Sequence, residues 1–545
     1  LEGRGQLNIS GNAGQTLDNV ITAAGSNWAI NNTGRLNIKM GGTVEDPRAN
    51  TALTLSSMTL GEGSSTNFTF NTDYAGPIIS VTGNISISQG AEITLSSTGR
   101  NELTLGADGS YTLMHADGTI DLGGSDRLAI LLDPSSSAFK KFENNAYLVM
   151  ENGNLVLVAT ASKDNKYARI ADTVNSKAGA ELLWNLPGDL AADSILKKVD
   201  DAVGALTSSN PSEAKRVMAA VAGSTVNALG TAQKDALRDQ MGWIRNRTTL
   251  MGVNPAYVNE DLPYFHMWME GTGSYAKLDT KGDESGYQLT TWGGTVGMDV
   301  DLSDHFTMGA AFTANYGDLT ASAADSADGH LDSYYANLFG RYQSKRWAHT
   351  LILTGGWNDA KLNRTVNYGE GSYRTQGNTN GWGFGAMYEL TYDVYLNEDR
   401  SSILQPLANA SVVTTRMDGY TETGAGNAGL NVGKQEWTTG TVALGGRWMG
   451  LIGSNIFGRE ALAEFRVNAA QDMGDRRGET NVALLGNPGF MQSVRGTKVG
   501  TTALQIGAGL SVPVGTQGTV FINGNADFRD GANSVNGSVG YRYDF

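Results

Sequence analysis

Cysteine is absent from this 545-residue chain, which excludes disulfide bonds and thiolate chemistry. Positive charge is scarce too, since 40 Lys and Arg residues stand against 55 Asp and Glu, for a formal net charge of -15. A nucleic-acid surface needs clusters of Lys and Arg against the phosphates, so this balance argues against nucleic-acid binding. Proline is rare, with 10 residues against 71 glycines, a composition that fits tight strands and loops rather than a disordered chain.

Long hydrophobic runs are missing as well. No stretch approaches the roughly twenty continuous apolar residues that a membrane-spanning helix needs, and the hydrophobic content of 40% is low for a helical membrane protein. The first residues, Leu1-Glu2-Gly3-Arg4, lead directly into strand-like sequence and form no secretory signal. An exported protein needs such a signal, so we expect a truncated or processed N-terminus if this chain leaves the cytoplasm.

Catalytic and ligand motifs are also lacking. The sequence contains neither a Gly-x-Ser-x-Gly elbow nor a phosphate-binding P-loop. Residues 424–429 have Gly-x-Gly-x-x-Gly spacing, but they lie in a polar stretch with no strand before and no helix after. Acidic residues at 283–284, 325 and 328 are explained more simply as solvated loop residues than as a cation site. Five histidines are scattered without metal-ligand spacing: His115, His266, His305, His330 and His349. We therefore expect no enzyme activity, cofactor or metal.

What the sequence has instead is alternation, clearest at the C-terminus. Successive side chains of a strand point to opposite faces, so residues 535–545 predict one apolar, aromatic face and one polar face. Segments 306–317, 381–394 and 520–529 alternate in the same way. An outer-membrane barrel strand needs an apolar face toward lipid and a polar face toward the lumen. The terminal apolar series is Val535, Gly537, Val539, Tyr541, Tyr543 and Phe545, and the polar series is Asn536, Ser538, Gly540, Arg542 and Asp544.

The region 253–545 is therefore predicted to be a twelve-stranded antiparallel transmembrane β-barrel. Connections between the strands are alternately short and mostly long, as expected for turns on the periplasmic side and loops outside. The last connection, 530–533, departs from this pattern. The expected strands are 263–277, 287–301, 305–317, 330–343, 346–358, 379–396, 402–415, 435–449, 456–469, 497–513, 519–529 and 534–545.

Residues 1–160 have a different texture. Short β runs such as 6–10, 35–39 and 84–87 recur between stretches of Gly, Asn, Ser and Thr, and each has too few apolar residues for an independent sheet. Stacked coil on coil they would bury a continuous core, so we predict a parallel β-solenoid, with a β-sandwich as the alternative. The segment 111–158 carries more large apolar residues. We expect it to cap the solenoid and to nucleate its folding, with Leu131 and Val149 in the nucleus.

Residues 161–252 are predicted to be helical. Leucine, isoleucine and valine recur at three- and four-residue spacing between 182 and 206. Asn210-Pro211 predicts a helix start, because proline is favoured at the first helical position. The helix expected over 211–251 is rich in Ala, Gly, Ser and Thr. Such a slim helix fits the lumen of a twelve-stranded barrel, which has room for one helix and little more.

This order of solenoid, slim helix and alternating domain resembles an autotransporter of the type V secretion class. The segment 109–116, Gly-Ser-Tyr-Thr-Leu-Met-His-Ala, is similar to the passenger-associated repeat of that family, and segments 236–242 and 268–273 are similar to the start of its barrel. The resemblance implies an outer-membrane barrel, a helix in its lumen, and a passenger on the cell surface. It also implies that the terminal Tyr541, Tyr543 and Phe545 guide barrel assembly, with the barrel-assembly machinery, periplasmic chaperones and outer-membrane lipid as partners.

Two positions depart from the family pattern. Many members carry Arg two residues after the first Trp of the barrel, where this chain has Glu270. Members that cleave themselves do so at an Asn-Asn pair in the lumen helix, and 206–251 contains no such pair, which argues against self-cleavage. Glu270, Arg341 and Arg542 all fall on the predicted lumen face, so we expect them to form a charge network around the helix.

The sequence thus predicts a secretion device in the outer membrane of a Gram-negative bacterium that displays its own N-terminal passenger. We expect the passenger to be an adhesin with an unidentified surface ligand. Two alternatives remain at this stage. One is a porin-like channel, in which a helix should not block the barrel. The other is an anchor for an enzymatic passenger, whose catalytic domain would lie upstream of residue 1.

Overall fold

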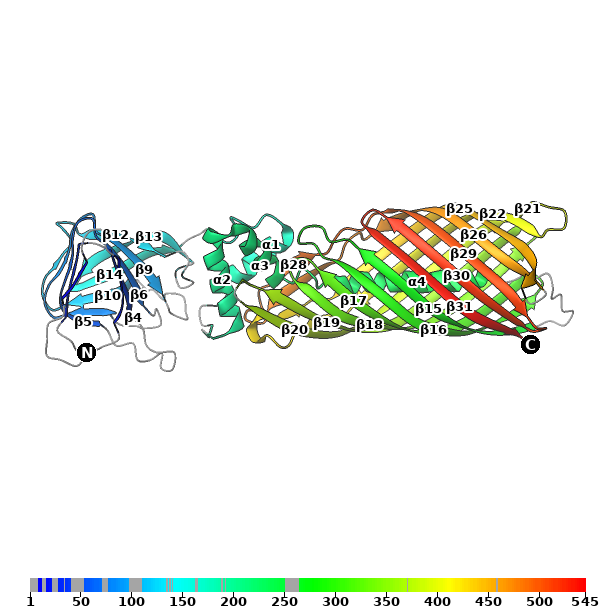
Figure 1. The fold of residues 1–545 in the computed structure, drawn as a ribbon, viewed down its shortest axis with the longest axis horizontal. Coiled ribbons are helices and arrows are strands. Elements are labelled where there is room, and N and C mark those ends of the chain that lie inside the picture. The colour runs from blue at the N-terminus through cyan, green and yellow to red at the C-terminus, as the bar shows by residue number, and fades with distance from the viewer. Residues whose placement is uncertain are drawn as a thin grey trace. The chain divides into compact units, whose positions relative to one another are not determined.

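The computed structural model describes residues 8–11, 16–21, 28–33, 35–40, 53–70, 77–97, 110–133, 136, 139, 141–161, 165–187, 190–191, 193–249, 264–369, 371–456 and 459–545 (Figure 1). The chain forms two compact units. Residues 1–172, 183–215 and 368–370 make the first, and residues 173–182, 216–367 and 371–545 make the second.

The first unit contains two rows of parallel strands, and the chain contributes to them in turn. Sequence segments far apart pair in register, for example Ile30 with Met58 and Leu36 with Thr66. One row is β1 (Asn8–Gly11), β3 (Trp28–Asn32), β5 (Leu53–Leu60), β7 (Ile79–Val81) and β10 (Ser110–Ala116). The other is β2 (Thr16–Ile21), β4 (Arg35–Met40), β6 (Ser65–Phe70), β9 (Glu92–Ser97) and β12 (Arg127–Leu132). Short parallel strands β8 (Ile85–Ile87) and β11 (Ile120–Asp121) extend from β5.

An antiparallel hairpin closes the two rows at the end of this unit. Strands β13 (Phe142–Glu151) and β14 (Asn154–Ala161) pair with each other, with β12 and with β10. Their two-residue turn, Asn152-Gly153, has positive φ at both positions, 48° and 78°. This is the backbone that favours Asn-Gly in tight hairpins.

Burial in the hairpin region shows where the two residues of the predicted folding nucleus lie relative to the core. Along β12 the buried side chains are Leu128, Ile130 and Leu132, whereas Leu131 is 49% exposed. Val149 on β13 is only half-buried, and its neighbour Leu148 is fully buried. Since strand side chains alternate, the continuous run Ile130-Leu131-Leu132 places its middle residue outside. Leu131 and Val149 are therefore not core residues.

Helices follow. α1 spans Val174–Trp184 and α2 spans Ile195–Ser209, where Ser194 caps the first turn by accepting a hydrogen bond from the backbone N–H of Lys197. Leu183, Leu186, Leu196, Val199 and Val203 are buried in the first unit. No helix among the described residues is long and apolar enough to cross a membrane.

The helix predicted over 211–251 is two helices. α3 spans Pro211–Val221, beginning at the predicted proline, and α4 spans Ala228–Thr249. Gly223 interrupts them with a φ of +81°. The backbone conformation favours glycine, and a Cβ at this position, 2.6 Å from Leu430 Cδ1, would also displace the Leu430 side chain.

The second unit is dominated by a closed barrel, and twelve long strands build it within the described residues. Each strand is antiparallel to the next, and the first pairs with the last along His266–Leu278 and Asp544–Ala532. The strands are β15 (Tyr264–Leu278), β16 (Gly286–Ser303), β17 (Phe306–Ser322), β18 (Ser326–Ser344), β19 (Trp347–Asn367), β20 (Ser372–Tyr392), β22 (Ser402–Met417), β25 (Gln435–Ile456), β26 (Arg459–Gly474), β29 (Thr502–Val514), β30 (Gly518–Arg529) and β31 (Ala532–Asp544), with the short β21 (Val394–Tyr395) beside β22. The predicted closed twelve-stranded barrel is confirmed.

One end of the barrel carries the start of β15, the end of β31 and short turns such as 345–346; we name it the turn end. The opposite, loop end carries the longer connections. Two of these, 418–434 and 475–501, contain a small sheet formed by β23 (Tyr420–Thr421), β24 (Leu430–Val432), β27 (Glu479–Leu484) and β28 (Gln492–Arg495), with the short 3-10 helix η2 (Gly426–Ala428).

Two predicted long loops, 318–329 and 359–378, are mostly strand. β17 and β18 meet at residues 323–325, and β19 and β20 meet at 368–371. The inward side chains near this end, including Leu319, Leu331 and Leu362, are apolar and pack in a cluster that includes Leu229. Both faces are therefore apolar in places, which weakened the alternation on which the prediction depended.

Candidate functional site: the barrel lumen and its helix

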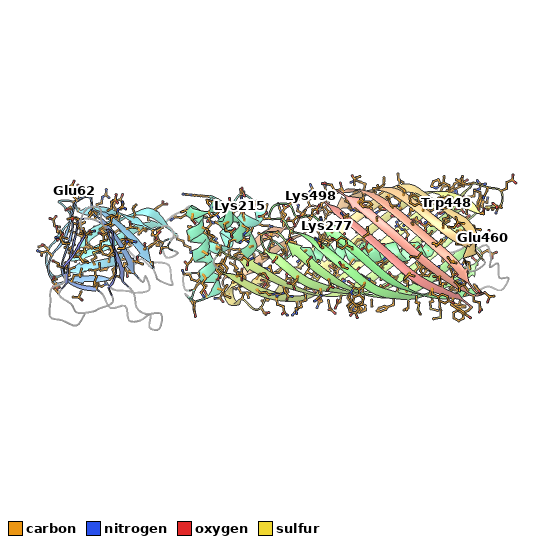
Figure 2. All side chains as sticks on the ribbon, in the orientation of Figure 1. Glu62, Lys215, Lys277, Trp448, Glu460 and Lys498 are labelled. Carbon is orange, nitrogen blue, oxygen red and sulfur yellow. The ribbon has the colours of Figure 1, made fainter. Side chains whose placement is uncertain are left out.

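The outer face of the barrel is apolar, as predicted. Phe312 is 45% exposed, Phe384 43% and Ile522 54%, whereas inward Thr313 is fully buried. Charged side chains lie beyond this band, with Lys277 and Lys498 near the loop end and Glu460 near the turn end (Figure 2). A strand face of this kind contacts lipid tails.

The terminal strand carries its aromatic residues on this outer face. Tyr541, Tyr543 and Phe545 are 41%, 37% and 56% exposed, while Arg542 and Asp544 are buried inside. Tyr543 and Phe545 pack edge to face with ring centroids 5.0 Å apart. The backbone N–H of Phe545 donates to the carbonyl of Phe265 at 3.1 Å, which continues the closure between β31 and β15.

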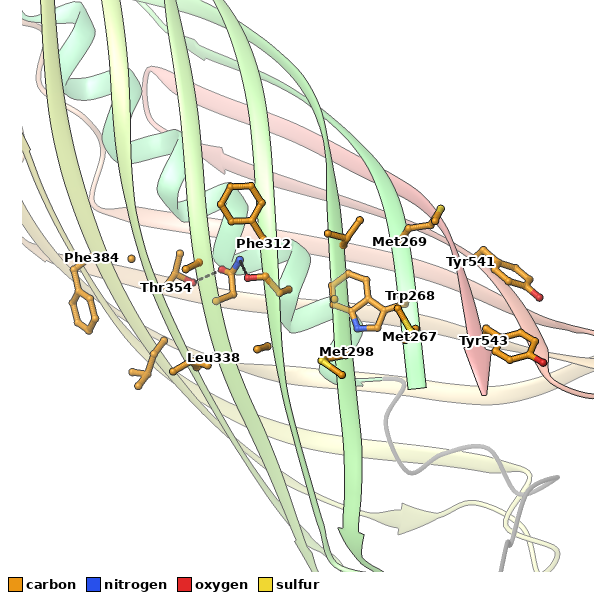
Figure 3. A pocket seen from close by; sticks show the side chains of 18 residues that line it. Met267, Trp268, Met269, Met298, Phe312, Leu338, Thr354, Phe384, Tyr541 and Tyr543 are labelled. Atoms are coloured by element: carbon orange, nitrogen blue, oxygen red, sulfur yellow. Dashed lines mark hydrogen bonds between the residues drawn. The ribbon is translucent and has the colours of Figure 1, made fainter. Parts of the chain in front are cut away.

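A shallow hollow of about 930 Å³ lies on the outer face across β15–β20 and β31 (Figure 3). It forms where small residues such as Ala310 and Gly355 lie among larger ones. The rim of the hollow includes Met267, Met298, Leu338, Phe384 and Tyr543, which Figure 3 labels. Because these rim side chains are apolar and exposed on the outer face, the hollow belongs to the lipid-facing surface.

Helix α4 runs inside the barrel (Figure 1). All of its residues are buried except Asp235, Arg238 and Gly242. Its N-terminal end lies at the loop end, where the Gly230 N–H donates to Gln435 Oε1 at 3.0 Å. Its last residue lies toward the turn end, where Thr249 Oγ1 accepts a hydrogen bond from Arg447 at 2.9 Å. The chain therefore passes through the lumen from one end of the barrel to the other.

One side of α4 packs against the wall through apolar contacts. Leu237, Met241 and Ile244 recur at three- and four-residue spacing and join a buried cluster with Trp268 and Phe339. Polar contacts fix the position of the same helix along the barrel and its rotation about its own axis. Gln233 Nε2 donates to Asn358 Oδ1 at 2.8 Å, and Gln240 Nε2 donates to Thr313 Oγ1 at 2.8 Å.

Ion pairs hold most basic residues of α4. Lys234 pairs with Asp235 at 2.8 Å, Arg238 with Asp472 at 3.0 Å, and Arg247 with Asp299 at 2.6 Å. On the wall, Arg447 pairs with Glu389 at 3.0 Å. Removing one partner of such a buried pair leaves an uncompensated charge, which costs about 3–5 kcal/mol. The basic residues of α4 are visible in the sequence and could have indicated these ion pairs. The prediction for this helix considered only its small residues.

The predicted trio Glu270, Arg341 and Arg542 does not form one network. Within the described residues, no hydrogen bond or ion pair joins any two of them. Arg341 donates to Gln343 Oε1 at 3.0 Å, and Arg542 donates to Asp544 Oδ2 at 2.9 Å. Glu270 is buried, and its Oε1 has no hydrogen-bond partner. Arg341 lies on β18, which β16 and β17 separate from β15. Alternation predicted that these three side chains point into the lumen. It could not predict whether they lie next to one another around the barrel wall.

A buried charge cluster joins the helix break to the loop end. Arg364 donates to both carboxylate oxygens of Glu422, at 2.8 and 2.7 Å, and to the carbonyl of Ala220 at 2.8 Å. It also contacts Asp325, which accepts a hydrogen bond from Thr225 at 2.9 Å. Burial raises the pKa of Asp325 to about 6. This loop-end cluster connects the strands, a loop and the segment between α3 and α4.

Other residues considered in the sequence have structural contacts. His266 hydrogen bonds to Asp544 at 2.7 Å and to Asp301 at 3.1 Å, tying β31 and β16 to β15. Asp283 Oδ2 accepts from the Ser176 N–H at 3.1 Å, in the first turn of α1. No cluster of three His, Cys, Asp or Glu suited to a metal occurs in the part of the chain described here. Residues 426–428 form η2 in a loop, outside any strand-to-helix turn.

Comparison with known proteins connects these features to a family. Residues 267–525 match the family described as the autotransporter beta-domain. Esterase EstA of Pseudomonas aeruginosa is 33% identical over 167 residues, covering 30% of this chain and 25% of the esterase. An extracellular serine protease of Serratia marcescens is 28% identical over 181 residues, covering 33% of this chain and 16% of the protease.

This chain therefore matches a quarter or less of the length of these two relatives. Among solved structures, the translocator domain of the autotransporter NalP from Neisseria meningitidis has a TM-score of 0.44 and 14% identity, over 59% of this chain and 100% of that domain. The transport unit of AIDA-I from Escherichia coli has a TM-score of 0.35 and 15% identity, over 56% of this chain and 97% of that one.

Proposed function

We propose that this chain, whose residues 267–525 are an autotransporter β-domain in the outer membrane of a Gram-negative bacterium, secretes its own N-terminal segment and displays it on the cell surface. The observation that carries the proposal is the path of the chain through the lumen. Thr249 contacts Arg447 toward the turn end, and Thr225 contacts Asp325 at the loop end. Since short turns face the periplasm and loops face outward, residues upstream of α4 leave on the exterior side.

The N-terminal strands supply a second line of support. Parallel pairs such as Ile9 with Ile30, and Phe68 with Leu95, are the pairings expected of successive coils of a β-solenoid. We propose that residues 1–160 are the C-terminal coils of such a passenger. Coils that fold outside cannot return through a lumen that already contains a helix, so folding would favour export over retreat.

An adhesive role for the passenger is the first candidate, with a surface ligand as its partner. An enzymatic passenger is the second candidate, because two relatives are named as an esterase and a serine protease. In that case the catalytic domain lies upstream of residue 1, and this chain acts as its exporter and anchor without catalysis of its own. Assembly of either form would require barrel-assembly machinery, periplasmic chaperones and outer-membrane lipid.

Surface display can be tested because the chain has no cysteine. A single cysteine introduced as Glu62→Cys lies in an exposed turn between β5 and β6, and Glu398→Cys lies in an exposed turn at the turn end. We expect a membrane-impermeant maleimide to label the first variant on intact cells. The second should be labelled only after the outer membrane is permeabilised. Equal labelling of both on intact cells, or of neither, would contradict display.

A further inference from the structure

Two short helical segments pack together at the loop end of the barrel. Residues 173–182 and 216–221, which include parts of α1 and α3, belong to the same compact unit as the barrel. At Gly179 a Cβ would lie 1.8 Å from the carbonyl oxygen of Met218, so α1 contacts the backbone of α3 directly at this position. We name these two segments the loop-end cap.

Asn175 joins the loop-end cap to two connections of the barrel. Its Nδ2 donates to the carbonyl of Asp283, in the connection 279–285, and to the carbonyl of Arg495 on β28, both at 2.9 Å. Its Oδ1 accepts a hydrogen bond from the backbone N–H of Arg495 at 2.8 Å. The side chain is fully buried. An amide has two N–H donors and one oxygen, so the barrel binds every polar atom of this side chain.

Further contacts spread around the loop end. The carboxylate of Asp283 accepts from the Ser176 N–H at 3.1 Å, in the first turn of α1, where a negative charge is favourable. On the second segment, Arg216 donates to the carbonyl of Ala324 at 2.6 Å and to that of Asn367 at 2.8 Å. These carbonyls belong to the β17–β18 connection and to the end of β19. The loop-end cap is therefore bound to the barrel at four separate positions.

The loop-end cap depends on the barrel for its stability. α1 and α3 have 11 residues each. Isolated helices shorter than about 12–15 residues are marginal in water, so these helices need tertiary contacts to persist. Both lie upstream of α4, and they can reach the loop end only after they have passed through the lumen that α4 then fills.

We propose that the loop-end cap is a lock that closes after export. It docks on the exterior side of the barrel once residues 173–221 have emerged, holds the exported chain there, and protects the anchoring segment from proteases. This inference rests on the proposed function, because the segment reaches the exterior only if the chain is exported. Asn175 and Gly179 are positioning residues of the lock.

Hydrogen exchange of the full chain in detergent tests the docking. Asn175→Ala leaves the backbone groups that it binds without their partner, and Gly179→Ala pushes α1 away from α3. Alanine is a better helix former than Asn or Gly, so faster exchange in these variants cannot come from a weaker helix. We expect amides of residues 173–182 to exchange at least tenfold faster in both variants. Lys177→Ala, at an exposed position of α1, is the matched control and should exchange like the wild type.

The lock is overturned if the wild-type segment exchanges as fast as an unfolded chain, or if either variant leaves its exchange unchanged. Should one variant fail to fold, the wild-type exchange and the other variant decide.

Protease treatment of intact cells tests the protective role. Cleavage within residues 173–221, located by mass spectrometry, should be several-fold faster in Asn175→Ala than in the wild type or in Lys177→Ala. Labelling of Glu62→Cys in the same cells reports export separately. Normal labelling with equally slow cleavage in all three chains overturns the lock alone. Absent labelling contradicts the proposed function and the lock with it.

Discussion

At the residue scale, the phase of alternation decides what a substitution does. Leu131 and Leu132 are chemically identical neighbours on β12, yet one is 49% exposed and the other 2%. Burying a leucine side chain contributes about 1.5–3 kcal/mol, and a carboxylate in its place adds the cost of a buried charge. Sequence position alone would treat the two residues alike.

We therefore expect Leu132→Asp to destabilise the N-terminal unit strongly and Leu131→Asp to have little effect. Protease digestion of the displayed chain on intact cells measures this, and Leu132→Asp should accelerate cleavage within residues 1–160 at least several-fold. Barrel insertion should be unchanged in both variants. Similar cleavage rates for the two variants would show that β12 does not pack as described.

Contacts between residues on different elements were the least predictable, because they depend on how the two elements are aligned. The outward direction of Tyr541 and the inward direction of Arg542 both followed from period two. The pairing of Arg247 on α4 with Asp299 on β16 depends on the rotation and depth of the helix in the lumen. No local pattern encodes either quantity. For the same reason the sequence analysis grouped Glu270 with Arg341, although β16 and β17 lie between the strands that carry them, β15 and β18.

At the element scale, the twelve strands were predictable because lipid outside and polar lumen inside impose one pattern on each of them. The errors arose where that contrast ends. Apolar lumen residues such as Leu331 and Leu362 extend the strands into predicted loops. The break between α3 and α4 depends on the positive φ of Gly223. A single glycine among other small residues does not by itself predict a positive φ.

The terminal strand is the element whose outer face we expect to matter for assembly. Replacing both Tyr543 and Phe545 with Ser removes two packed aromatic rings from the lipid face beside the seam with β15. We expect several-fold less folded barrel in the outer membrane, measured by heat-modifiable gel mobility. Val535→Ser, on the same face of β31 but near the loop end, is the matched control and should insert normally. An equal loss in the control would assign the effect to general lipid contact.

At the scale of the whole molecule, the filled lumen separates a secretion device from a channel. α4 is held by apolar packing on one side and by ion pairs such as Arg238–Asp472 and Arg247–Asp299 on its polar residues. Among the described residues, a cavity of about 70 Å³ and another of about 30 Å³, which share Arg238 and Asp239, lie beside it. Spaces of this size admit water and small ions in single file at most.

We therefore expect low conductance from the full chain in planar bilayers. A chain that begins at residue 250 lacks α4 and should conduct at least several-fold more, because the polar wall residues such as Thr313 and Asn358 would then line an open lumen. A chain that begins at residue 173 retains α4 and should stay as low as the full chain, which assigns the block to the lumen helix rather than to the N-terminal unit. A large current from the full chain would favour the porin-like alternative. Equal currents from all three chains would show that α4 does not obstruct the pore.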